Sequence, residues 1–121
     1  GAAMTDSSAW LIYNHLPPLA RAKLMSDLFD ARNGIGLRFL RVPIGASDFT
    51  VGGKPYTYDD MPAGQTDSTL SNFSTAHDES YIFPLLRQML ALAPGTETFA
   101  VPWSPPAWMK ANGVQARIAR S

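Results

Sequence analysis

The chain has 121 residues, of which 45% are hydrophobic and 17% charged, a composition typical of a folded globular protein. Ten basic and ten acidic residues balance without a basic cluster or stripe, so we expect no nucleic-acid partner. The absence of cysteine excludes disulfides and cysteine-metal sites, and no apolar run approaches the roughly 20 residues that a membrane-spanning helix needs.

The first third of the chain predicts two helices. Asp6 or Ser7 can cap a short first helix, because either side chain can accept from free backbone N–H groups. Pro17-Pro18 ends that helix and begins the next, which Asn33-Gly34 stops. A buried face of this second helix is predicted by apolar residues four positions apart, Leu24, Met25, Leu28 and Phe29.

The rest of the chain predicts strands separated by a long loop and a helix. A strand over 37–42 ends at Pro43, and the segment 45–75 is rich in Gly, Pro, Ser, Thr and Asp. This segment has about 30 residues, more than structureless loops usually have, which indicates a functional loop. An amphipathic helix over roughly 78–92, with an irregular start at Pro84, precedes a strand over 98–101. The alternation predicts a parallel sheet with helical crossovers.

Polar and aromatic residues gather after the predicted strands, in the segments 3–8, 41–49 and 101–110. The carboxyl ends of parallel strands meet at one edge of a sheet, which is where such folds place their sites. Carboxylates, a guanidinium, hydroxyls and indoles together suit a neutral polyhydroxylated ligand, since sugar hydroxyls need hydrogen-bond partners and the sugar ring packs on a flat aromatic surface.

The same segments carry a family resemblance. The motifs AMTDSSAW, GIGLRFLRVPIGASDFT, YTYDD, NFS and PWSPPAWMKANG are similar in order and spacing to those of glycoside hydrolase family 30. That family includes glucosylceramidases, β-glucosidases, β-xylosidases and endo-β-1,6-glucanases. The resemblance implies a (β/α)₈ TIM barrel, of which residues 1–113 form roughly the first three β/α units, while residues 114–121 do not continue the pattern.

By match to that family, Asp48 and Trp103 contact the sugar in the −1 subsite and Arg41 orders the carboxylates of the pocket. From the residues alone, Asp48 could instead be a turn residue or an ion-pair partner of Arg41, and Trp103 could be a core aromatic. A supporting role at the site falls to four further residues, Asp6, Trp108, Tyr58 and Asn112. For three of them a structural role is an alternative: a helix cap for Asp6, packing for Trp108, and bracing of the long loop for Tyr58.

The resemblance also implies a retaining glycoside hydrolase acting on a carbohydrate or glycolipid without a cofactor or metal. Such enzymes use two glutamates, placed by the family after the fourth and seventh barrel strands, and Glu79 and Glu97 match neither. We therefore expect this segment to supply part of the −1 subsite and to be inactive by itself. The alternative is a non-catalytic remnant or sugar-binding fragment of a truncated reading frame. Compartment and oligomeric state stay open, with a secreted parent protein as one option.

Overall fold

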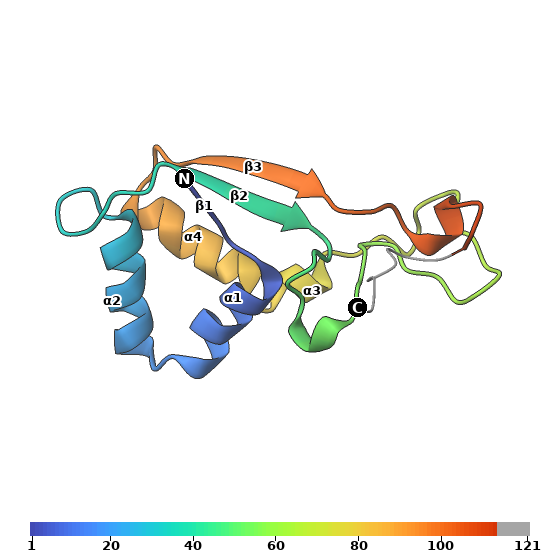
Figure 1. Cartoon of the computed structure of the whole chain (residues 1–121), viewed down its shortest axis with the longest axis horizontal. Coiled ribbons are helices and arrows are strands. Elements are labelled where there is room, and N and C mark those ends of the chain that lie inside the picture. The colour runs from blue at the N-terminus through green and yellow to red at the C-terminus, as the bar shows by residue number, and fades with distance from the viewer. Residues whose placement is uncertain (114–121) are drawn as a thin grey trace.

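Three parallel strands form the sheet in the computed structural model, which describes residues 1–113 (Figure 1). The strands β1 (Ala2–Ala3), β2 (Phe39–Ile44) and β3 (Glu97–Pro102) lie side by side in that order. Arg41 of β2 is in register with Ala3 on one side and with Phe99 on the other. The predicted parallel sheet with helical crossovers is confirmed, and all three strands end at the same edge.

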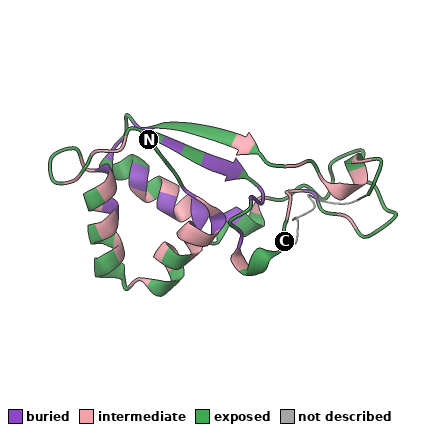
Figure 2. Ribbon diagram, in the orientation of Figure 1, coloured by how far each residue is buried: buried purple, intermediate pink, exposed green. Residues whose placement is uncertain are grey.

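Helices cover one face of this sheet (Figure 1). They are α1 (Asp6–Trp10), its π-helical continuation (Leu11–His15), α2 (Pro18–Phe29), α3 (Ala76–Glu79) and α4 (Ile82–Leu92). The core lies between the helices and β2, and Figure 2 shows its buried residues along β2 and α4. Its members are Met4, Ala9, Met25, Phe29, Leu40, Val42, Tyr81, Ile82, Leu85, Met89 and Ala93. None of the helices in residues 1–113 combines the length and the apolarity needed to cross a membrane.

Two helix starts differ from the predictions. Thr5 caps α1, not Asp6 or Ser7: its hydroxyl accepts from the Ser8 amide while the Ser8 hydroxyl accepts from the Thr5 amide. The predicted helix over 78–92 is two helices, with a break at Tyr81, whose φ of −154° is not helical. Pro84 then lies in the first turn of α4, where its missing N–H breaks no helical hydrogen bond.

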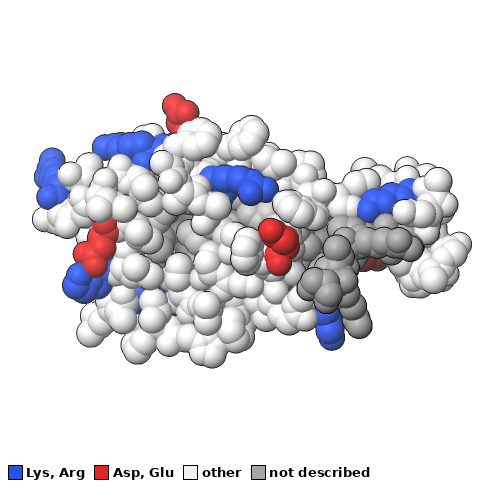
Figure 3. All heavy atoms as spheres, viewed as in Figure 1, with Lys and Arg blue, Asp and Glu red and all other residues white. Residues whose placement is uncertain are grey.

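The other face of the sheet is open. Leu40 and Val42 point into the core, so the alternation of strand side chains leaves Arg41 on the opposite face. Phe39 and Phe99 stack on that face with ring centroids 6.4 Å apart, and each side chain is about half exposed. Charged side chains are scattered over the surface in view in Figure 3, without a patch of one sign.

The long segment after β2 has the irregular backbone that its composition predicts. It contains a single 3₁₀ turn (Val51–Gly53), and a second 3₁₀ turn (Ala107–Met109) follows β3. At Gly45 the chain passes so close to another part of the loop that an added Cβ would lie 3.0 Å from the Tyr56 carbonyl oxygen. The backbone there has a φ of +76°, which favours glycine. This tight turn directs residues 46–50 toward the carboxyl ends of the strands.

Candidate functional site

A pocket of about 190 Å³ opens at the carboxyl ends of the three strands. Its lining comprises Ala3, Thr5, Arg41, Pro43, Ser47, Asp48, Phe49 and Trp103. Segments after β1, β2 and β3 each contribute, because parallel strands deliver their following residues to one edge. The structure thus brings Arg41, Asp48 and Trp103, which are up to 62 positions apart (103 − 41), to one pocket.

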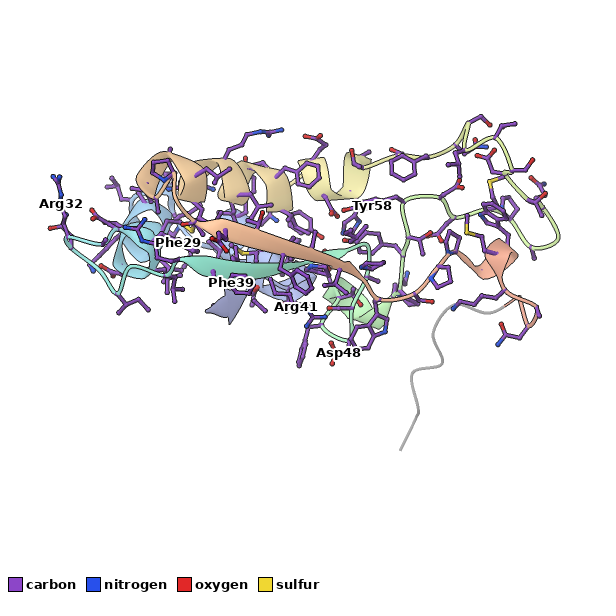
Figure 4. All side chains as sticks on the ribbon, turned by 90° about the horizontal axis from the view of Figure 1, so that it is seen from above. Phe29, Arg32, Phe39, Arg41, Asp48 and Tyr58 are labelled. Atoms are coloured by element: carbon purple, nitrogen blue, oxygen red, sulfur yellow. The ribbon has the colours of Figure 1, made fainter. Side chains whose placement is uncertain are left out.

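The polar and aromatic walls of this pocket face solvent. Trp103 is 48% exposed and Phe49 61% exposed, so neither ring is a core aromatic. Asp48 is exposed as well, and it forms no ion pair with Arg41, although both residues are in the described part of the chain. Figure 4 shows Arg41 on β2 and Asp48 on the loop beyond that strand. An open carboxylate, a guanidinium and two aromatic rings therefore share one solvent-accessible pocket.

Asp6 lies behind the pocket and does not line it. Its side chain is 1% exposed, and its carboxylate accepts from the Val51 amide at 2.7 Å. His77 Nε2 lies 2.8 Å from the other carboxylate oxygen, which also accepts from the Tyr81 hydroxyl. Burial, followed by the hydrogen bond and the charge of Asp6, raises the pKa of Tyr81 above its usual range. Asp6 therefore contacts three polar groups, the Val51 amide from the loop and the His77 ring and Tyr81 hydroxyl from the α3–α4 region.

A second buried carboxylate, Asp78, braces the long loop. It is fully buried and accepts from the Tyr56 hydroxyl at 2.7 Å and from the Tyr58 hydroxyl. Burial raises the pKa of Asp78, and the two tyrosine hydrogen bonds oppose that shift. In turn, burial and then the Asp78 bond raise the pKa of both tyrosines. The Tyr58 hydroxyl thus ties its part of the loop to α3, and Tyr58 is not among the residues that line the pocket.

The two remaining supporting candidates also lie outside the pocket lining. Trp108 donates its indole N–H to the Asp59 carbonyl oxygen at 2.9 Å, which ties the 3₁₀ turn after β3 to the long loop. Asn112 is exposed near the end of the described chain. Sequence reasoning did not single out Phe49, whose ring forms part of the pocket wall. Its position next to Asp48, in the segment that follows a strand, was the available signal.

The fold and the pocket define an α/β protein with parallel strands, helical crossovers and its candidate site at the carboxyl ends of the strands. Within that class the family follows from comparison with known sequences. A family model described as the glycosyl hydrolase family 30 TIM-barrel domain matches residues 1–118, and the chain belongs to this family. The predicted end of the family-like region, after residue 113, falls where the structure describes no further residues.

Similar proteins include glycosidases that are named for different activities. An endo-1,6-beta-D-glucanase of Neurospora crassa is 39% identical over 112 residues, which are 93% of this chain and 22% of that protein. The lysosomal acid glucosylceramidase of Mus musculus is 37% identical over 115 residues, 93% of this chain and 21% of that protein. The solved structure of SrfJ from Salmonella typhimurium has a TM-score of 0.81 at 32% identity, covering 94% of this chain and 24% of the other. The chain thus spans less than a quarter of the length of these relatives.

Proposed function

We propose that this chain forms the first three β/α units of a barrel in a retaining β-glycosidase, and that its pocket is part of the −1 sugar subsite. One observation carries the proposal: Arg41, Asp48 and Trp103 line the same pocket at the carboxyl ends of the strands. Family membership supports glycosidase chemistry. The relatives act on β-1,6-glucan or glucosylceramide by name, so a β-linked glucoside is the substrate class that we favour.

Each of the three side chains suits a contact with a sugar. The half-exposed indole of Trp103 offers a flat apolar surface to the apolar face of a pyranose ring. The exposed carboxylate of Asp48 can accept hydrogen bonds from sugar hydroxyls, and the Arg41 guanidinium can donate them. The pocket, about 190 Å³, is smaller than the roughly 300–1,000 Å³ of typical ligand sites. We infer that it is one wall of a subsite that further barrel strands complete.

We propose that the two catalytic carboxylates come from barrel strands other than the three described. Retention requires two carboxyl groups about 5–5.5 Å apart across the scissile bond. Glu97 is the first residue of β3, at the end of the sheet opposite to the pocket. Glu79 ends α3 and pairs with Arg87 at 3.2 Å. Neither glutamate lines the pocket, which favours a sugar-binding segment that does not cleave its ligand alone.

Binding and turnover measurements on the purified chain test this proposal together. We expect methyl β-glucoside to bind weakly, Asp48→Asn to weaken binding, and Asp27→Asn, an exposed residue paired with Lys23, to leave it unchanged. An aryl β-glucoside should show no turnover. Equal binding by wild type and Asp48→Asn would contradict the subsite. Turnover that disappears in Asp48→Asn would contradict the assignment of catalysis to other strands.

A further inference from the structure

The loop that carries Asp48 is tied to the first turn of α1 by two hydrogen bonds. The Ser7 amide donates to the Phe49 carbonyl oxygen at 3.0 Å, and the Val51 amide donates to the Asp6 carboxylate at 2.7 Å. The first amides of a helix have no partner within the helix, so the Ser7 N–H is free to make this contact. The two bonds engage residues that follow Asp48 by one and by three positions. They fix the loop immediately behind the pocket wall.

The carboxylate of Asp6 is itself immobilised. It is 1% exposed, and burying a charge is costly unless hydrogen bonds compensate. His77 Nε2 at 2.8 Å and the Tyr81 hydroxyl contact one oxygen, which leaves the other for Val51. The His77 ring is in turn stacked on Tyr56, with ring centroids 3.7 Å apart. Asp6 therefore joins the α3–α4 region to the pocket loop through a chain of specific contacts.

We propose that Asp6 is a positioning residue of the sugar pocket: held by His77 and Tyr81, it fixes the Asp48 loop through the Val51 amide. The inference rests on the proposed sugar subsite, and it assigns to Asp6 an action through the loop and no contact with the ligand. Gly52 and Gly53 follow with φ values of +67° and +64°, in open space for an added side chain. These glycines have no side chain that could hold the loop, so the Val51 hydrogen bond and the Ser7–Phe49 bond are the contacts that tie it to α1.

The chain offers a variant that removes this bond and leaves Asp6 intact. Val51 begins its 3₁₀ turn, and Thr50 before it is extended, with φ −101° and ψ 150°. Proline fits the first position of a turn and favours an extended residue before it. Val51→Pro therefore removes the N–H donor and places the proline ring against the Asp6 carboxylate, so the contact is lost and the two groups must separate. Val51→Ala, which keeps the N–H, is its matched control. Asp6→Asn tests the same bond from the acceptor side, since it removes the charge at nearly constant volume.

The test measures affinity for methyl β-glucoside by NMR titration together with hydrogen exchange of the loop amides. We expect Asp6→Asn and Val51→Pro each to weaken binding about tenfold, the effect of losing one hydrogen bond to a charged group, and to speed exchange at Asp48 and Phe49. Val51→Ala should do neither. Asp30→Asn, which removes a loop carboxylate beyond α2, should lower stability without changing affinity.

The outcomes separate the inference from the proposed function. If Val51→Pro binds the glucoside with wild-type affinity, the inference is overturned. It is also overturned if Asp6→Asn speeds hydrogen exchange at the Val51 amide but leaves the affinity unchanged. If wild type binds no glucoside, the proposed function fails, and the exchange data alone then decide whether Asp6 holds the loop. If hydrogen exchange at the Val51 amide is unchanged in Asp6→Asn, Asp6 does not hold the loop.

Discussion

Removing the Tyr56 hydroxyl should destabilise the protein in a pH-dependent way. This hydroxyl donates to the fully buried Asp78 carboxylate at 2.7 Å. A hydrogen bond to a charged group contributes about 1.5–3 kcal/mol, and because this one is part-buried we expect about 1.5 kcal/mol for Tyr56→Phe. For a domain of this size that corresponds to a fall in Tm of roughly 6 °C. The phenyl ring can still stack on His77, so packing should change little.

The pH dependence follows from the raised pKa of Asp78. Since the folded state favours the protonated acid, the contribution of Asp78 to stability is fully present below its unfolded pKa of about 4 and is lost as pH rises through the folded pKa. The Tyr56 bond opposes this loss because it stabilises the charged form. The destabilisation by Tyr56→Phe should therefore be larger at about pH 7.5 than at about pH 4.

Urea unfolding at both pH values measures the effect. Tyr13→Phe is the matched control, because Tyr13 holds Arg21 through its ring face and its backbone carbonyl. In a double-mutant cycle with Asp78→Asn, the effect of Tyr56→Phe should shrink, since the carboxylate charge is then absent. A loss below about 0.5 kcal/mol, or an equal loss at the two pH values, would show that the Tyr56 hydroxyl does not stabilise the charged form of Asp78.

Three further predictions concern the core, the loop and its turn. Met89→Ala, at a fully buried core position, should lower the free energy of unfolding by about 2–5 kcal/mol in urea; a loss below about 1 kcal/mol would contradict the described core. Burial and then the Asp67 charge raise the pKa of Asp59, so the free energy of unfolding should fall as pH rises through that pKa. Asp59→Asn should make this fall smaller, and an unchanged pH profile in the variant would count against the effect of Asp67 on Asp59. Gly45→Ala should cost about 1–2 kcal/mol, because φ is +76° and the Tyr56 carbonyl is close; a neutral result by thermal unfolding would argue against this turn.

The sequence predicted the elements that depend on local pattern. Met25 and Phe29 are buried as the spacing of apolar residues in α2 indicated, and β2 and β3 lie within two residues of their predicted bounds. The break at Tyr81 was not predicted beyond an irregular start, and at this break the Tyr81 hydroxyl donates to Asp6, 75 positions away. Periodicity within a window of residues carries no information about such a contact.

In the candidate site too, some features could be predicted from the sequence and others could not. The edge of the sheet followed from the alternation of strands and helices, whereas Arg41, Asp48 and Trp103 were singled out by the resemblance of their motifs to the family, and the residues alone left structural roles open for them. The role of Asp6 did not follow, because capping is a local property whereas its partners Val51 and His77 are 45 and 71 positions away. An aspartate beside a helix start predicts a cap, and only the folded chain shows that Thr5 takes this role.

The most direct test of the sugar pocket is an NMR titration that follows the indole N–H signals of the three tryptophans with methyl β-glucoside. We expect a saturable shift of Trp103, which lines the pocket, and none of Trp10 or Trp108, which lie outside its lining. Asp48→Asn should reduce the Trp103 response at equal glucoside concentration. A shift confined to Trp108, or a Trp103 response that Asp48→Asn leaves unchanged, would contradict the assignment of this pocket to sugar binding.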